Sequence, residues 1–268
     1  MVKLTDGEFL EFVHYMHNNY GIDLSKKRIL IEGRLSNIIE KKGMKSFGQY
    51  LENVKKNNKD EITTLINKLT TNYTYFYRED NHFKYLKDVI LPYEEKNNKS
   101  KILSIWSAGC SSGEEPYTLA MVIDDYFKFS RGQWKIQILA TDISENVLSK
   151  AREGVYAEDS LKNLPEAYKK RYFAKTDDGK FRVLPNIRKY ITFNVFNLMN
   201  PIAVKNKHDV IFCRNVMIYF NAETKINMVN KFYEATKPGG YLMIGHAETI
   251  QRNQSKYQYI NPAIYKKV

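Results

Sequence analysis

A short turn of small residues lies between a hydrophobic run and a helix-like stretch, and it contains Gly109 and Gly113. Because glycine has no Cβ, the backbone at these two positions can pass close to a bound ligand. Asp142 ends the next hydrophobic run of this region. A carboxylate in that place can accept hydrogen bonds from the two vicinal hydroxyls of a ribose. The turn and the acid together indicate a site for a nucleoside.

The spacing of this turn argues against the two common phosphate-binding motifs. It is not G-x-G-x-x-G, and no Lys-Ser/Thr pair follows the second glycine. A nucleoside cofactor without a pyrophosphate, such as S-adenosylmethionine, fits these residues better. Two structural alternatives stay open: an ordinary strand-to-helix turn, and Asp142 as the N-cap of the following helix.

The segments around these residues alternate between strand and helix patterns. Strands are predicted at 102–107, 136–141, 209–213 and 241–245, and helices at 81–91, 114–127, 144–151 and 222–236. Pro238-Gly239-Gly240 is predicted to stop the last of these helices. This alternation predicts an α/β fold with a mostly parallel sheet covered on both faces, and it places the turn and Asp142 at the carboxyl edge of the sheet.

The first seventy residues have a purely helical pattern. Thr5 and Glu8 fit a capping box at the start of the first helix, and Gly21 is predicted to end it. Further helices are predicted at 25–42, 47–55 and 60–69. We therefore predict a helical N-terminal domain at 1–70 and an α/β domain at 71–268, which begins with a linker at 71–100.

Two shorter predictions complete the α/β domain. Strand-like runs at 171–175 and 180–184 flank Asp177-Asp178-Gly179, a turn signal, and predict a small antiparallel β insert at about 171–190. Runs at 257–259 and 263–266 predict a terminal hairpin.

At this point the sequence resembles the CheR family of chemotaxis receptor glutamate methyltransferases over almost its full length. The segments that carry the resemblance are 71–79 (TNYTYFYRE), 106–117 (WSAGCSSGEEPY), 140–143 (ATDI), 212–220 (FCRNVMIYF), 237–240 (KPGG) and 245–248 (GHAE). The resemblance implies the class I S-adenosylmethionine-dependent methyltransferase fold, which is Rossmann-like, with a small helical N-terminal domain. It also implies methyl transfer from S-adenosylmethionine to glutamate side chains of chemoreceptor helices, which leaves S-adenosylhomocysteine and γ-methyl esters for chemotactic adaptation.

The family motifs assign roles to individual residues of this chain. With Gly109 from the turn, the predicted cofactor-binding residues are Asn72, Thr74, Arg78, Gly109, Glu115, Asp142, Asn197, Leu198, Arg214 and Asn215. The predicted catalytic residues are Arg78, which would hold the acceptor carboxylate through its planar guanidinium, and Tyr219, which would help position it. No general base is required, because a glutamate is already ionised near pH 7. The enzyme has to desolvate and align it, and alignment can lower a barrier by up to roughly 7–11 kcal/mol.

The N-terminal domain contains a basic stretch between Leu24 and Lys45. Its basic residues are Lys26, Lys27, Arg28, Arg34, Lys41, Lys42 and Lys45, against only two acidic residues, Glu32 and Glu40. Because receptor methylation helices are acidic, complementary charge favours docking on this stretch. The alternative is a solvated helix face without a partner.

The predicted β insert also bears on the partners. Some members of the family bind a pentapeptide tether of the receptor through a longer, Gly-containing loop in this hairpin. Here residues 175–180 are shorter and lack that Gly pattern. The sequence therefore resembles the tether-independent branch, and we expect no pentapeptide binding.

Composition narrows the class of protein. The chain has 42 basic and 30 acidic residues and a net charge of +12, which favours acidic partners. Cys110 and Cys213 lie far apart, so neither a disulfide nor a thiolate zinc site is expected, and His14 and His17 lack a third ligand. No metal, no membrane insertion and no secretory signal are predicted, and we expect a cytoplasmic monomer.

Two other functions fit parts of these data. An RNA-directed methyltransferase would explain the positive charge, but the strand end at Cys213-Arg214-Asn215-Val216 has no N/D-P-P-Y/F signature, so no nucleic acid is expected as partner. A non-catalytic receptor adaptor would have a damaged acceptor site, whereas Arg78 and Tyr219 are both present.

Overall fold

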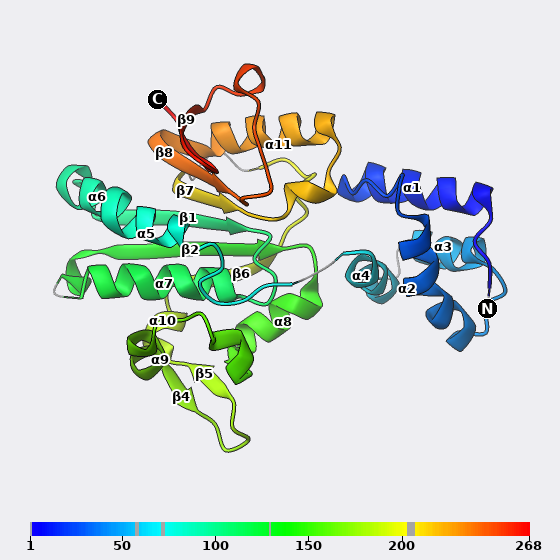
Figure 1. The fold of residues 1–268 in the computed structure, drawn as a ribbon, viewed down its shortest axis with the longest axis horizontal. Coiled ribbons are helices and arrows are strands. Elements are labelled where there is room, and N and C mark those ends of the chain that lie inside the picture. The colour runs from blue at the N-terminus through cyan, green and yellow to red at the C-terminus, as the bar shows by residue number, and fades with distance from the viewer. Residues whose placement is uncertain (1, 57–58, 71–72, 129, 203–206) are drawn as a thin grey trace.

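The computed structural model describes residues 2–56, 59–70, 73–128, 130–202 and 207–268 (Figure 1). Within these ranges, the N-terminal helices lie at one end of a larger α/β unit. Every described helix is too short or too polar to cross a bilayer.

The N-terminal helices are α1 (Asp6–Tyr20), α2 (Arg28–Lys41), α3 (Phe47–Lys55) and α4 (Lys59–Leu69). The predicted capping box is confirmed, because the Thr5 side chain accepts the Glu8 N–H and the Glu8 carboxylate accepts the Thr5 N–H. Gly21 ends α1 in the left-handed conformation at φ 69°. The α2 helix begins later than predicted, because Asp23 accepts the Ser25 N–H and holds this segment in a turn.

A seven-stranded sheet forms the centre of the α/β unit, in the order β6-β2-β1-β7-β8-β10-β9. Its parallel strands are β1 (Ile102–Ala108), β2 (Lys135–Asp142), β6 (Ile191–Val195), β7 (His208–Cys213) and β8 (Thr236–Ile244). The terminal hairpin of β9 (Gln258–Asn261) and β10 (Ile264–Lys266) adds the antiparallel edge, as predicted. The predicted α/β class with a mostly parallel sheet is confirmed.

Helices cover both faces of this sheet (Figure 1). They are α5 (Asn81–Tyr85), a π-helical segment (Leu86–Ile90), α6 (Leu91–Asn97), α7 (Glu114–Tyr126), α8 (Glu145–Glu153) and α11 (Ala222–Ala235). Trp106 and Phe232 pack on one face, with ring centroids 5.4 Å apart. Phe83 and Phe212 stack on the other, with centroids 6.2 Å apart. Single 3₁₀ turns lie at Arg131–Gln133, Glu158–Leu161, Met217–Tyr219 and Arg252–Gln254.

The β insert is a small antiparallel sheet in the order β3-β5-β4, at the bottom of Figure 1. It consists of β3 (Val155–Tyr156), β4 (Phe173–Lys175) and β5 (Phe181–Val183), with the short helices α9 (Glu166–Tyr172) and α10 (Pro185–Arg188). The antiparallel character is confirmed, but the predicted strand at 171–175 is wrong at its start. Arg171 and Tyr172 are the last residues of α9, and the Tyr172 side chain is fully buried.

Two further predictions about the sheet are corrected. Helix α11 ends at Ala235, and Pro238-Gly239-Gly240 lies inside β8 rather than in a loop before it. The register between β7 and β8 shifts between His208 and Val210, so the strand accommodates these residues as an irregularity. Strand β6 was not predicted, because none of its residues is fully buried and its hydrophobic pattern is weak.

Candidate active site

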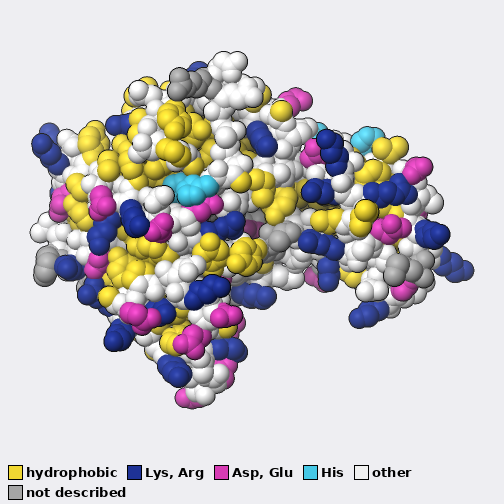
Figure 2. Space-filling view, viewed as in Figure 1, with side chains coloured by type: hydrophobic (Ala, Val, Ile, Leu, Met, Phe, Trp, Pro, Cys, Tyr) yellow, Lys and Arg dark blue, Asp and Glu magenta, His cyan; other side chains and the backbone are white. Residues whose placement is uncertain are grey.

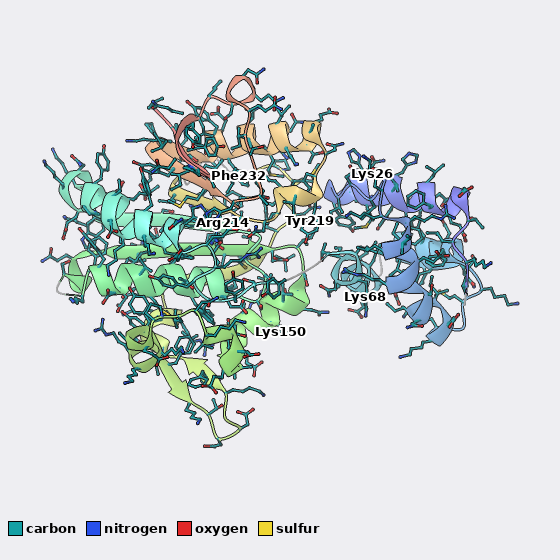
Figure 3. All side chains as sticks on the ribbon, viewed as in Figure 1. Lys26, Lys68, Lys150, Arg214, Tyr219 and Phe232 are labelled. Atoms are coloured by element: carbon teal, nitrogen blue, oxygen red, sulfur yellow. The ribbon has the colours of Figure 1, made fainter. Side chains whose placement is uncertain are left out.

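A cleft of about 1010 Å³, including its open mouth, lies at the carboxyl edge of the sheet on the side of the N-terminal helices. Its walls come from the turns after β1, β2 and β7, from the segment after β6, and from Thr70, Tyr73, Thr74, Tyr75 and Arg78. Tyr20 and Ile22 add a contribution from the end of α1. Figure 3 shows Arg214 and Tyr219 at this edge, with Lys26 across from Tyr219 on the N-terminal side. Open α/β sheets bind their ligands at this edge.

The turn after β1 and the end of β2 form the floor of the cleft. Gly109 has φ 85°, and a Cβ there would come within 2.3 Å of the Val216 side chain, so only glycine fits. Asp142 is 9% exposed and accepts the N–H groups of Ser111 at 2.9 Å and of Ser144 at 3.0 Å. The N-cap of α8 is Ser144, so the alternative reading of Asp142 as that cap is wrong. Its carboxylate keeps further lone pairs beyond these two bonds.

A buried ion network joins the turn after β7 to α7. Arg214 is 3% exposed in its side chain and donates to Glu115 Oε2 at 3.0 Å and to Glu79 Oε2 at 3.1 Å. Ser107 donates to the other oxygen of Glu115 at 2.7 Å. Asn215 donates to Glu79 at 3.3 Å. The network fixes the polar wall of the cleft.

The environment shifts the pKa values of these acids in different directions. Burial raises the pKa of Glu115, although Arg214 and Ser107 oppose the shift. Burial alone would raise the pKa of Glu79, but Arg214 and Asn215 hold it below its ordinary value. Burial also raises the pKa of Asp142, against the backbone N–H groups of Ser144 and Ser111.

Arg78 lies on the cleft wall among aromatic side chains. Its Nη1 donates to the Tyr73 carbonyl oxygen at 2.7 Å, and its guanidinium lies 5.9 Å from the Tyr73 ring centroid and 6.0 Å from that of Tyr75. Among the described residues, Arg78 has no carboxylate partner. These contacts orient the guanidinium and leave its other N–H groups for an anion.

The turn after β7 carries Asn215 and Tyr219. Asn215 adopts the left-handed conformation at φ 58°, and Met217–Tyr219 form a 3₁₀ turn. The N-terminal unit meets this turn directly, because the Asp23 N–H donates to the Tyr219 carbonyl oxygen at 2.7 Å. Ile22 and Phe220 form an isolated antiparallel bridge beside it.

The segment after β6 also joins both units. Asn197 donates from its side-chain amide to the Asn19 carbonyl oxygen at 2.7 Å, and its Oδ1 accepts the Met199 N–H at 3.0 Å. Leu198 is 8% exposed and lines the cleft. Asn197 therefore holds the end of α1 against the cleft.

All predicted site residues that the structure describes line this one cleft: Thr74, Arg78, Gly109, Glu115, Asp142, Asn197, Leu198, Arg214, Asn215 and Tyr219. Asn72 lies outside the described residues. The sequence did not predict that Glu79 pairs with Arg214, although Glu79 belongs to the family-like segment 71–79. Sequence reasoning also missed Tyr20 and Ile22, because nothing in the sequence signals that α1 reaches the cleft.

The predicted docking residues lie outside the cleft and differ among themselves. Arg28 pairs with Asp6 at 2.5 Å, Lys42 pairs with Glu61 at 2.5 Å, and Arg34 donates to the carbonyl oxygens of Lys68 and Thr70, each at 2.9 Å. The remaining four, Lys26, Lys27, Lys41 and Lys45, are exposed and make no ion pair in the described part of the chain. Figure 2 shows basic side chains spread over the N-terminal helices at the right.

A histidine cluster lies beside the ion network. Among the described residues, Glu79, His82 and His246 are grouped with ligand atoms within 4.8 Å of one another, as a metal site would require. His82 is fully buried, and neither ring nitrogen has a hydrogen-bond partner there. Glu79 Oε2 already accepts from the Arg214 guanidinium, whose positive charge disfavours a cation at this carboxylate.

The cleft fits S-adenosylmethionine by the chemistry of its lining. Asp142 offers carboxylate lone pairs to ribose hydroxyls, and Phe196 and Leu198 offer apolar surface. The parallel sheet, its carboxyl-edge cleft and these lining residues define the class of Rossmann-like S-adenosylmethionine-dependent methyltransferases.

Comparison with known proteins gives the particular family. The family model described as "CheR methyltransferase, SAM binding domain" matches residues 72–265, and "CheR methyltransferase, all-alpha domain" matches residues 7–70. The chain belongs to the CheR methyltransferase family and is an S-adenosylmethionine-dependent methyltransferase.

Several relatives align over nearly the whole chain. The chemotaxis protein methyltransferase of Borreliella burgdorferi is 46% identical over 99% of this chain and 96% of its own length. Chemotaxis protein methyltransferase 1 of Pseudomonas aeruginosa is 36% identical over 97% of this chain and 96% of its length. The chemotaxis protein methyltransferase of Escherichia coli is 35% identical over 98% and 92%.

Proposed function

We propose that this protein transfers a methyl group from S-adenosylmethionine to glutamate side chains of chemoreceptors and forms γ-methyl esters. The relatives, which are called chemotaxis protein methyltransferases, support the receptor as substrate. The observation that carries the proposal is Arg78, a cleft arginine without a carboxylate partner among the described residues. A guanidinium in that position suits an incoming carboxylate.

The residues of the chain orient this acceptor. Arg78 is fixed by the Tyr73 carbonyl and two tyrosine rings, so its planar fork can hold a glutamate carboxylate in one orientation. Tyr219 lines the same cleft from the turn after β7. The bound cofactor supplies the electrophilic methyl group. The acceptor is already ionised near pH 7, so the chain needs no base and contributes alignment and exclusion of water.

The predicted division of labour between the two units is part of the proposal. We assign receptor docking to the helical unit at 1–70, through Lys26, Lys27, Lys41 and Lys45, and methyl transfer to residues 71–268. Lys26 is three residues from Asp23, so their Cα atoms lie at most roughly 11 Å apart. Because Asp23 is bonded to Tyr219, a receptor helix bound at Lys26 lies near the cleft.

The same proposal covers the assembly and the β insert. We propose a cytoplasmic monomer that works without a pentapeptide tether. The loop between β4 and β5 is tight, with the Thr176 N–H bonded to the Lys180 carbonyl oxygen at 2.8 Å and the Gly179 N–H to the Thr176 oxygen at 3.0 Å. Micromolar affinity for a receptor C-terminal pentapeptide, measured by calorimetry, would contradict this part.

One assay tests the reaction. Purified protein is incubated with methyl-tritiated S-adenosylmethionine and either receptor cytoplasmic fragments or RNA. Label on the receptor fragment that mild alkali releases as methanol supports glutamate ester formation. Alkali-stable label on RNA, or no label on either substrate, contradicts it.

A further inference from the structure

Glu248 is a buried carboxylate that lies behind the cleft rather than in it. It is 7% exposed and follows β8 in the turn that begins at Gly245. Its Oε2 accepts the backbone N–H groups of Asn215 at 3.0 Å and Gly245 at 2.6 Å. Its Oε1 accepts the Ile218 N–H at 3.1 Å. No cationic side chain pairs with it in the part of the chain that the structure describes.

The turn after β7, which Glu248 contacts, lacks hydrogen bonds of its own for some of its backbone N–H groups. Asn215 is a non-glycine residue at φ 58°, and the N–H groups at the start of the 3₁₀ turn have no partner within it. A buried N–H without a partner costs about 1–3 kcal/mol. Glu248 supplies the acceptors for this turn from a different loop.

The two loops approach each other backbone to backbone. A Cβ on Gly245 would lie 2.8 Å from the Asn215 nitrogen and 2.6 Å from its Nδ2. A side chain at position 245 would therefore push the turn away from Glu248. The GHAE segment and the turn after β7 act as one structural unit.

We propose that Glu248 is a positioning residue for methyl transfer, which fixes Asn215 and Tyr219 through the backbone N–H groups of their turn. The catalytic part of this proposal rests on the proposed function. The hydrogen bonds that carry it do not.

The first test is Glu248→Gln, which keeps the size of the side chain but turns an NH₂ group toward an N–H group. Because misplacing reacting groups by about 1 Å can reduce rates by roughly 10²-fold, we expect kcat to fall by about that factor.

The matched control is Asp209→Asn at the opposite end of β7. Asp209 is 5% exposed and accepts the Ser104 N–H and the Lys237 Nζ, each at 2.7 Å. The control should lower Tm and leave kcat within about twofold. Equal kcat losses in the two variants would overturn the proposal.

A double-mutant cycle separates positioning from general destabilisation. If Glu248 acts through the turn, Glu248→Gln should reduce kcat much less in a Tyr219→Phe background than in the wild type. Losses that simply multiply would argue against coupling and overturn the role.

Amide hydrogen exchange tests the contacts without any receptor. Exchange at Asn215, Ile218 and Gly245 should accelerate in Glu248→Gln more than at other buried amides. Unchanged exchange there would overturn the proposal, whereas a wild type that methylates no receptor would contradict only the proposed function.

If the Glu248→Gln variant does not fold, Gly245→Ala tests the proposal instead, because it displaces the same turn with the carboxylate intact. A normal kcat in Gly245→Ala would overturn the proposal on its own.

Discussion

Arg214 in the cleft is 3% exposed and bonded to two carboxylates, whereas Lys26, Lys27, Lys41 and Lys45 around α2 are exposed and make no ion pair among the described residues. The charges of Arg214, Glu79 and Glu115 are held in fixed positions at low dielectric, and they pair with one another. The charges around α2 are exposed and screened by salt, so they attract an acidic surface without fixing its geometry. The charges of the cleft therefore suit alignment of the substrate, and the lysines around α2 suit the first encounter with the receptor.

The largest expected effect comes from breaking the cleft network. Arg214→Ala leaves Glu79 and Glu115 buried without their cation, so we expect the free energy of unfolding to fall by about 3–5 kcal/mol and activity to be lost. Urea unfolding measures the change. Glu11→Gln removes an exposed pair with Lys55 and should change it by about 1 kcal/mol or less. Similar values for both variants would contradict the distinction between buried and exposed charges.

Arg78 and Tyr219 should affect rate rather than stability. Arg78→Ala removes the guanidinium that orients the acceptor, and Tyr219→Phe removes a hydroxyl at the cleft, so each should lower kcat/KM by more than tenfold, or about 1.4 kcal/mol. Steady-state methylation of receptor fragments measures this. A loss below tenfold in both variants would show that neither residue positions the substrate.

The basic residues near α2 should act on encounter alone. Lys26→Glu with Lys27→Glu should raise the KM for receptor by about tenfold at low salt, with kcat and cofactor affinity unchanged. The difference in KM between this variant and the wild type should shrink in high salt, because salt screens the attraction between the wild-type lysines and the receptor. The matched control reverses two exposed lysines near the β insert, Lys162→Glu with Lys170→Glu. Equal KM changes in the two double variants would show that only the net charge of the protein matters, and not the position of Lys26 and Lys27.

The smallest effect concerns pH. Burial, the Arg214 charge and the neighbouring His246 lower the pKa of His82 to about 3, against the opposing charge of Glu79. The unfolded chain therefore binds a proton at His82 below its ordinary pKa of 6.5, and the folded chain does not. Stability should fall as the pH drops from about 6.5 toward about 3, by up to about 1.4 kcal/mol per pH unit from this group.

Urea unfolding across this pH range isolates the contribution of His82. His82→Leu should show a shallower loss of stability than the wild type. His14→Leu, at an exposed position of α1, should keep the wild-type slope. A slope unchanged by His82→Leu would mean that the buried imidazole is protonated in the folded state.

Local signals predicted much of the fold. The capping box of α1 and the N-cap Ser144 depend on residues close in the chain, and both are confirmed. The edge strand β6 and the start of α9 depend on packing against distant elements, so periodicity missed them.

The site shows the same division. Gly109 and Asp142 were predicted because each follows a predicted strand, and the other cleft residues were predicted from the family motifs that the sequence resembles. The bond from Asp23 to Tyr219 joins residues almost two hundred positions apart, and no local pattern encodes it. The partners of Arg28, Arg34 and Lys42 likewise depend on how the N-terminal helices pack, so their charges looked equally available in the sequence.

The bridge between Ile22 and Phe220 has a consequence for evolution and for engineering. Tyr20 and Ile22 of the helical unit form part of the wall of the cleft, so this unit also helps to build the site. Chimeras that exchange this unit between family members should retain turnover only if residues 20–23 and 219–221 are exchanged together. New receptor specificity would then arise by joint change of both segments.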